Sequence, residues 1–349
     1  MRKPRRVIGI LLILLIMPLA LGSCQSAITA SAPQNAASIS EPTRSAEPAD
    51  AGAVVDLLNI APAYTSPVPN VDIKASLYFG YYNENMLARE TYLISQPYDR
   101  SAASLLIEAL LKGPSPARSD LTRLFPAGTR LTALREQEGV LFVTLSEDFL
   151  KTPPSFSPAD ANALSALRAV RRLALSSLIN TVTEAAEIDA VQLLVASEQA
   201  GANGTRIARD EIFDDINSGG RLLGVMYRDE TVMLTHANTL SVVLESWTRQ
   251  NWNRLYRFVS YESTGGAPAL EAFAAIMSEC PNAPLYYDIS SGSVSEDGTR
   301  AVFRADISWL NDGQAWPWSG TIPLMLEDGV WKISIRTLLR LGGYEDDFS

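Results

Sequence analysis

The residue with the clearest covalent chemistry is Cys24, which closes the sequence Leu21-Gly22-Ser23-Cys24. A basic cluster over residues 1–6 and an apolar run over residues 7–21 precede it. A basic flank, a short apolar core and small residues before a cleavage point are typical of a secretory signal peptide. The run is shorter than the ~20 apolar residues that a membrane-spanning helix needs. The pattern therefore predicts export, with a cysteine thiol, a strong nucleophile when ionised, directly after the cut.

The last four of these residues resemble the lipobox of bacterial lipoproteins. The resemblance implies that Cys24 carries a diacylglycerol and that a peptidase cuts between Ser23 and Cys24. Two acyl chains hold a protein firmly on a bilayer, because each buried CH₂ contributes about 0.8 kcal/mol. We therefore expect a signal peptide over residues 1–23 and a mature protein anchored on the extracytoplasmic face of the cell membrane. A plain signal peptide, or a short membrane anchor with an incidental cysteine, is the alternative.

The rest of the chain lacks the residues that most reactive sites require. Removal of the four basic residues of the signal peptide leaves 25 basic against 39 acidic residues, a net charge of about −14, which disfavours nucleic-acid binding. His236 is the only histidine, so no histidine-based zinc site can form. No glycine-rich phosphate-binding loop occurs. With Cys24 lipidated, Cys280 has no disulfide partner and is expected to be a small buried side chain. We expect no catalytic residues, no metal and no cofactor.

Composition separates a tether from a folded part. Residues 24–70 carry the predicted lipid and an Ala/Ser/Pro-rich tether that cannot bury enough apolar area to offset its ordering entropy. From residue 72 the hydrophobic pattern becomes regular. It predicts strands over 73–79 and 87–94, a helix over 101–112 stopped by Gly113-Pro114, a hairpin of 129–136 and 139–145, a helix over 158–183 and a strand over 190–196.

Residues 72–200 resemble the GerMN domain, a family named for spore germination and sporulation proteins. The blocks that carry the resemblance are Leu77-Tyr78-Phe79, residues 105–111 with Gly113-Pro114, Phe125-Pro126-Ala127-Gly128-Thr129, residues 140–143 and Leu145-Ser146-Glu147-Asp148-Phe149. The sequence departs from the family at Thr144, where Asp is frequent, and at Val195-Ala196-Ser197, where Val-Asp-Gly is usual. We expect structural roles for these blocks, and the resemblance implies a binding or assembly module.

The C-terminal part has a different order of elements. Residues 204–235 are predicted to connect the two parts, with short strands over 221–227 and 231–234 that could pair. Helices over 238–259, with Asn238 as its N-cap, and 268–277 then precede strands over 283–291, 300–310, 319–327 and 330–339. Tight turns are expected at Asp297-Gly298 and Asp328-Gly329. Residues 237–341 thus resemble NTF2-like domains, which fold as a cone with an open pocket.

That second resemblance suggests where a pocket would lie. Some NTF2-like enzymes use an Asp and a Tyr in the cone, and Tyr286, Asp288 and Asp306 lie on the predicted strands. A carboxylate inside an apolar cone would have a raised pKa. We expect Trp331 to be a core residue, while Trp309, Trp316 and Trp318 form a cluster that is either core or partner-facing.

These features predict an α+β fold with two domains: a GerMN-like α/β sandwich with a mixed sheet, and an NTF2-like cone of helices on a curved antiparallel sheet. We expect a non-enzymatic, lipid-anchored envelope protein. Its partners would be the membrane, through Cys24, and an envelope protein or peptidoglycan, in sporulation or germination if the family analogy holds. The alternative is a small-ligand carrier or an enzyme that uses a pocket in the NTF2-like domain.

Overall fold

The computed structural model describes residues 70–154, 157, 160–186, 188–197, 201–214 and 219–344. The predicted signal peptide, Cys24 and nearly all of the predicted tether lie outside these residues. The described elements all belong to one compact unit, Thr65–Ser349. Within the described ranges, no helix is both long enough and apolar enough to cross a bilayer.

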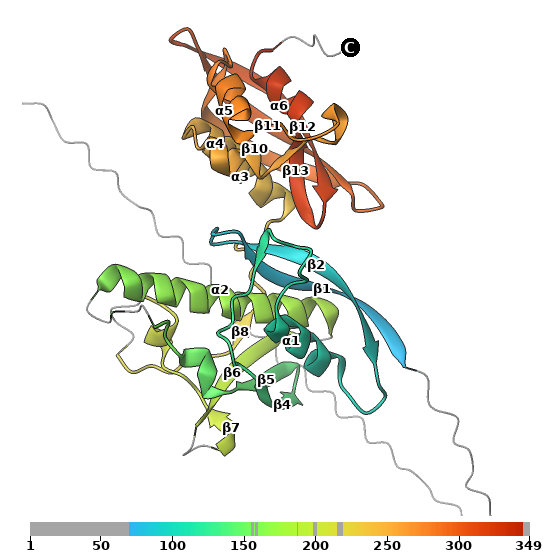
Figure 1. The fold of residues 1–349 in the computed structure, drawn as a ribbon, viewed down its shortest axis with the longest axis vertical. Coiled ribbons are helices and arrows are strands. Elements are labelled where there is room, and N and C mark those ends of the chain that lie inside the picture. Colours follow the sequence, from blue (N-terminus) through green and yellow to red (C-terminus); the bar gives the residue numbers. More distant parts are fainter. Residues whose placement is uncertain are drawn as a thin grey trace, which may run out of the picture. The chain divides into compact units, whose positions relative to one another are not determined.

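A three-stranded antiparallel sheet begins the described part (Figure 1). The central strand β1 (Val71–Tyr81) pairs with β2 (Leu87–Gln96) on one side and with the short β3 (Leu121–Thr122) on the other. Helix α1 (Ala102–Lys112) follows β2 and begins where the Ser101 hydroxyl accepts the N–H of Ser104 at 3.2 Å. It ends at Gly113, whose φ of 99° favours glycine. The two predicted strands and this helix are confirmed to within two residues.

A second, mixed sheet contains β4 (Leu131–Gln137), β5 (Val140–Leu145), β6 (Ala190–Ser197) and β7 (Gly201–Thr205), in that order. β4 and β5 form the predicted hairpin, and its turn residues Glu138 and Gly139 have φ of 54° and 74°, as a type I′ turn requires. The 3₁₀ turn η1 (Glu147–Leu150) follows β5. β5 and β6 are parallel, because α2 (Ala161–Ala185) forms the crossover between them. Figure 1 shows α1 and α2 between the two sheets.

The predicted connecting segment 204–235 does more than connect the two parts, because its short runs pair with strands of both sheets. It includes the short helical turn η2 (Arg209–Glu211), and the two-residue strand β8 (Met226–Tyr227) pairs with the start of β6. Met233 forms a bridge to Leu87 at the start of β2. The sequence had suggested that the two short runs of this segment could pair with each other. In the structure they do not: each pairs with a strand of a different sheet. A two-stranded ribbon gains little stability alone, whereas addition to an existing edge satisfies backbone groups at once.

The buried hydroxyl groups of α2 hold the edge of β1 that β2 leaves free. The N–H of Tyr78 donates to Thr181 Oγ1 at 3.2 Å, and the Ser177 hydroxyl donates to the carbonyl of Tyr78. Ser177 is 1% exposed and Thr181 is 0% exposed. Buried backbone groups need hydrogen-bond partners. These two side chains therefore supply the hydrogen bonds that a neighbouring strand would otherwise make to Tyr78.

The C-terminal part places helices against a sheet that is antiparallel except for one short parallel pair at its edge. The helices are α3 (His236–Thr248), α4 (Trp252–Tyr256), α5 (Leu270–Ser278) and α6 (Ile335–Leu341), with a short turn η3 (Glu262–Thr264). The sheet order is β10 (Ala283–Val294), β11 (Arg300–Asn311), β12 (Gln314–Glu327), β13 (Val330–Ser334) and β9 (Val259–Ser260). The predicted turn at Asp328-Gly329 is confirmed, with positive φ at both residues.

Three expectations for this part were wrong in detail. The predicted helix 238–259 breaks into α3 and α4 at Gln250, which has a φ of 54°. The N-cap of α3 is Thr235, whose hydroxyl accepts the N–H of Asn238 at 3.2 Å, so Asn238 lies inside the helix. The predicted strand 330–339 ends at Ser334, because its side chain caps α6 by accepting the N–H of Thr337 at 3.1 Å.

Aromatic side chains fill the covered face of this sheet. The rings of Trp247 from α3 and Trp309 from β11 meet edge to face with centroids 5.4 Å apart. Both are 1% exposed, Phe258 and Phe273 are fully buried, and Trp331 is a core residue at 7% exposed, as predicted. These aromatic side chains fill the covered face around Trp247 and Trp309, whereas a pocket of about 450 Å³ lies beside Phe273, Ile276 and Leu339 of α5 and α6.

Candidate functional site

The three residues proposed for a cone pocket lie together, but on the exposed face of the C-terminal sheet. Asp288 on β10 stands directly opposite Asp306 on β11, and Tyr286 is 68% exposed. Both carboxylates are exposed, and Asp306 accepts a hydrogen bond from Ser319. The neighbouring Tyr287 points the other way and donates to the Ser241 carbonyl at 3.4 Å. Side chains alternate across a strand, so these three residues do not line a pocket on the covered face.

The isolated His and Cys side chains sit in structural settings. The ring of His236 lies 5.1 Å from that of Phe303 and 5.6 Å from that of Trp331, and burial lowers its pKa. Burial raises the pKa of the Cys280 thiol to about 11, so little thiolate exists at neutral pH. Across the described ranges, no group of three His, Cys, Asp or Glu side chains is placed to hold a metal ion.

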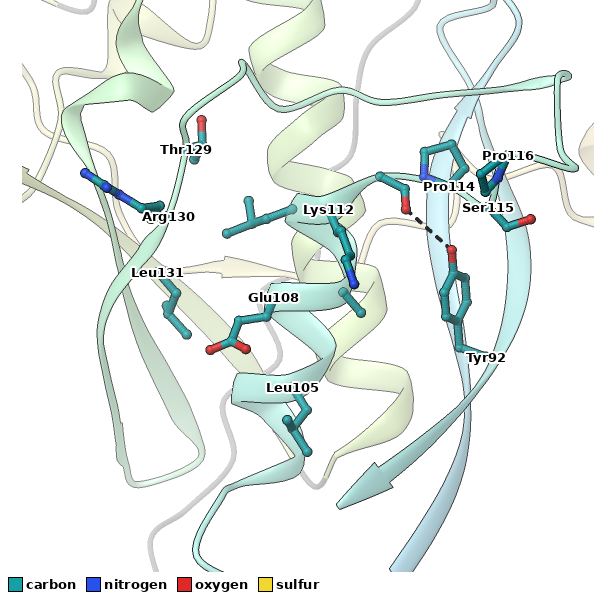
Figure 2. Close-up of a pocket in the computed structure, with 13 residues that line it drawn as sticks. Tyr92, Leu105, Glu108, Lys112, Pro114, Ser115, Pro116, Thr129, Arg130 and Leu131 are labelled. Atoms are coloured by element: carbon teal, nitrogen blue, oxygen red, sulfur yellow. Dashed lines mark hydrogen bonds between the residues drawn. The ribbon is translucent and has the colours of Figure 1, made fainter. Parts of the chain in front are cut away.

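A broad pocket of about 1060 Å³ lies on the outer side of α1 in the first part of the protein. We call it the trough. Figure 2 shows α1 as its floor, Tyr92 of β2 on one side and residues 129–131 before and at the start of β4 on the other. Its lining is Tyr92, Leu105, Glu108, Ala109, Leu111, Lys112, Gly113, Pro114, Ser115, Pro116, Thr129, Arg130 and Leu131.

The floor of the trough follows from the amphipathic pattern of α1. The side of the helix that carries Leu106, Ile107 and Leu110 is buried in the core. Leu105 and Ala109 are only partly buried and face the trough, while Glu108 is exposed and forms an ion pair with Arg100. The helix therefore offers a half-buried apolar strip whose one acidic side chain already has a cationic partner.

The wall on the β2 side is fixed by a half-buried tyrosine and a carboxylate. The Tyr92 hydroxyl lies 3.2 Å from Glu90 Oε2 and 3.4 Å from the Gly113 carbonyl, the second contact being the dashed line in Figure 2. Burial, with a smaller contribution from Glu90, raises the Tyr92 pKa to about 12. Glu90 also accepts the N–H of Ser115 at 3.1 Å. The loop after α1 is thereby tied to β2.

The opposite wall is held through the backbone of Arg130. Its N–H donates to the Ser146 hydroxyl at 3.1 Å, and its carbonyl accepts the Ser146 N–H at 2.8 Å. The Thr129 hydroxyl donates to the Pro126 carbonyl at 2.8 Å. Figure 2 shows the guanidinium of Arg130 directed away from α1, so that this residue lines the trough without turning its charge into it.

Sequence reasoning had treated the Gly113-Pro114 and Gly128-Thr129 blocks only as a helix stop and a turn. The structure confirms the helix stop and also brings the two blocks to opposite sides of one pocket. A signal was present in the sequence, because a basic residue lies beside each block: Lys112 before the first and Arg130 after the second. Nothing in the sequence showed that two segments so far apart would meet.

Comparison with known proteins places a family on this first part. Residues 76–201 match the Germane family model, described as sporulation and spore germination. The match supports a GerMN-type domain over these residues, which lie within one residue of the predicted range 72–200 at the C-terminal end and begin four residues later at the N-terminal end. No curated protein gives a significant match to the chain.

Several solved structures resemble parts of the chain. The tandem GerMN domains of the sporulation protein GerM from Bacillus subtilis show 15% identity over 47% of this chain and 48% of that chain, with a TM-score of 0.29. The first GerMN domain of the same protein shows 17% identity over 45% of this chain and 98% of that chain, with a TM-score of 0.28. A putative lipoprotein from Clostridium perfringens shows 25% identity over 37% of this chain and 80% of that chain, with a TM-score of 0.22.

The first of these matches covers about half the length of the tandem GerM structure. At such low TM-scores, the structural likeness by itself carries no conclusion about function. The family match over residues 76–201 links the domain to sporulation and germination proteins.

Proposed function

We propose that this chain is a non-enzymatic lipoprotein of the cell envelope whose GerMN-type domain binds a partner through the trough, in sporulation or spore germination. The observation that carries this proposal is the trough itself. It is a wide pocket with an apolar floor, built from the segments that the family match covers. Apolar pockets with a few polar groups at their rim are typical binding sites.

The trough suits binding better than it suits a reaction. Its titratable side chains are Tyr92, Glu108, Lys112 and Arg130. Glu108 is paired with Arg100, and the raised pKa of Tyr92 keeps its hydroxyl protonated at neutral pH. A general base needs a pKa near the working pH and a proton acceptor within reach of substrate, and neither residue supplies one. The alternative, a ligand or reaction in the C-terminal part, loses support because Tyr286, Asp288 and Asp306 lie on the exposed face of the sheet.

Cross-linking from the trough tests the binding role. A photoreactive amino acid at Ala109, in the floor, should trap a partner in intact cells of the source organism. The matched control carries the same group at Val302, which is 40% exposed on the C-terminal sheet. Specific products from Ala109 but not from Val302 are expected. Equal labelling patterns from both positions would remove the trough as the binding site.

The anchor is tested separately, with the full chain expressed in the cell envelope. Cys24→Ala should leave the precursor uncut. Because the variant carries no lipid, the fraction of the protein that partitions into detergent through its lipid should fall. Cys280→Ala serves as the control, because Cys280 is the only other cysteine. An unchanged membrane fraction and unchanged processing in Cys24→Ala would exclude lipidation. Deletion of the gene in a spore former should lower sporulation or germination, and a normal spore yield with normal germination would sever that link.

A further inference from the structure

The outer edge of β2, beside the trough, is an open strand edge. β1 pairs with β2 along its length, and β2 is the last strand of its sheet. The Tyr81 N–H donates to the Met86 carbonyl at 3.0 Å. This hydrogen bond shows which residues of β2 direct their backbone groups toward β1. Backbone groups in such a ladder alternate between the partner strand and the outside. Those that point to β1 belong to Ala88, Glu90, Tyr92 and Ile94, and those that point away belong to Arg89, Thr91 and Leu93.

The protein already uses the first part of this edge to hold a strand. The Leu87 N–H donates to the Val232 carbonyl at 2.7 Å, and the Leu87 carbonyl accepts the Leu234 N–H at 2.8 Å. This parallel bridge ends at Met233. Farther along β2, no backbone hydrogen bond from another described segment reaches the outward groups of Thr91 and Leu93. Thr91 is exposed and Leu93 is 72% exposed. Exposed edges with unmet groups accept added strands.

The charges beside this edge favour an acidic partner. The Lys112 side chain lies over the trough, and it has no salt bridge to a residue in the described ranges. The acidic side chain that lines the trough is already engaged, since Glu108 pairs with Arg100. One cation, Lys112, therefore lies at the apolar floor without a salt bridge to a described residue, within a protein whose overall charge is −10.

We propose that the open edge of β2 binds an extended segment of a partner protein by strand addition, with acidic and apolar side chains of that segment in the trough. This inference rests on the proposed function and names the kind of partner. Main-chain hydrogen bonds to Thr91 and Leu93 supply affinity that does not depend on sequence. Every second side chain of an added strand faces the same side. Those on the trough side meet Leu105 and Ala109 when apolar, and Lys112 when acidic.

The first test uses defined synthetic peptides and the full chain. The probe is a short labelled peptide in which threonine alternates with valine and glutamate, and its partner probe carries lysine in place of glutamate. We expect the glutamate peptide to bind. The Lys112→Glu variant should bind it about fivefold more weakly, which corresponds to about 1 kcal/mol, and should favour the lysine peptide. Equal affinity of both proteins for both peptides would overturn the assignment of acidic side chains.

The second test addresses the strand edge itself. Thr91→Pro removes an outward N–H without removing a hydrogen bond to β1, a position where strands tolerate proline. It should lower peptide binding at least tenfold, while Thr91→Val, which keeps the N–H, should bind as the wild type does. Hydrogen exchange of the wild-type Thr91 and Leu93 amides should slow at least tenfold when the glutamate peptide is added. Unchanged exchange at both amides would rule out strand addition even if Thr91→Pro disturbed folding.

The outcomes separate this inference from the proposed function. If Ala109 cross-links to a partner while the β2 amides stay unprotected and Thr91→Pro leaves binding intact, strand addition is wrong and the binding role of the trough stands. If sedimentation shows a concentration-dependent dimer that Thr91→Pro abolishes, the occupant is a second copy of this chain and the acidic partner segment is wrong. If Ala109 captures nothing and no peptide binds, both proposals fail.

Discussion

Replacement of Thr181 by valine should destabilise the GerMN-type domain much more than the same replacement at Thr183, two positions farther along α2. Thr181 Oγ1 accepts the buried N–H of Tyr78 at 3.2 Å, and valine has no acceptor. Thr183 only donates its hydroxyl to the Ile179 carbonyl at 2.7 Å within the same helix, and it is partly exposed. The two variants share the same change in shape and helix propensity, so their difference isolates the buried hydrogen bond.

The expected size follows from the buried N–H that loses its partner. A buried donor without an acceptor costs about 1–3 kcal/mol, whereas a surface change stays within about 0.5 kcal/mol. With an m-value of about 2–3 kcal/mol per M in urea, a loss of about 2 kcal/mol lowers the unfolding midpoint by roughly 0.7–1 M. Thr181→Ser, which keeps the acceptor and loses a methyl group, should fall between the two valine variants.

The assay must report on the correct part of the protein. All six tryptophans lie between Trp247 and Trp331, so tryptophan fluorescence follows only the C-terminal part. Urea unfolding should therefore be followed by far-ultraviolet circular dichroism, together with hydrogen exchange of the Tyr78 amide. Equal midpoints for Thr181→Val and Thr183→Val, with the Tyr78 amide equally protected in both, would refute the role assigned to the α2 hydroxyls.

Three further results are expected. Trp309 is 1% exposed, so Trp309→Ala should lower the unfolding free energy by about 3–5 kcal/mol in urea titrations followed by fluorescence. Trp316 is 37% exposed, so Trp316→Ala should lower it by about 1 kcal/mol or less, and similar losses for the two variants would contradict the burial of Trp309 in the core. Cys280, whose pKa is raised by burial to about 11, should react with a thiol reagent at pH 8 far more slowly in the native than in the unfolded chain, and equal rates would count against its burial. Hydrogen bonds from Ser295 and Thr299 hold the Asp297 pKa at about 2. Because this pKa is lowered in the folded protein, the ionised carboxylate stabilises the turn above pH 3.8, and this stabilisation is lost as the pH falls through 2. A carboxyl NMR titration of Asp297 centred near 3.8 would show that the turn is not formed.

The sequence predicted best where the signal is local. The period of α1, the glycine after it and the hairpin turn at Glu138 and Gly139 are set by residues within a few positions of each other. The errors arose where short polar groups compete for backbone atoms. Thr235 took the cap expected from Asn238, and Ser334 turned the end of a predicted strand into α6. Each of these outcomes depends on which side chain forms the hydrogen bond to a given backbone N–H, and the hydrophobic pattern does not encode that choice.

The candidate site depends on contacts that no local pattern contains. Sequence placed Tyr286, Asp288 and Asp306 on strands, but the facing of a strand depends on its register, and the bulge in β10 between Pro284 and Tyr286 changes the alternation there. The register was therefore needed to show that these side chains are exposed.

The amino-acid sequence by itself determined the α+β class of this protein, the helix stops and turns, the order of the GerMN-type blocks and the expectation of a lipid on Cys24. These features follow from propensities and spacings that act over a few residues. Only the tertiary structure decided that α1 keeps one side open, that residues 112–116 and 129–131 line a common trough, and that Thr91 and Leu93 lie on an unpaired edge. The physical reason is that packing between distant segments decides which backbone groups and charges find a partner and which stay available for one.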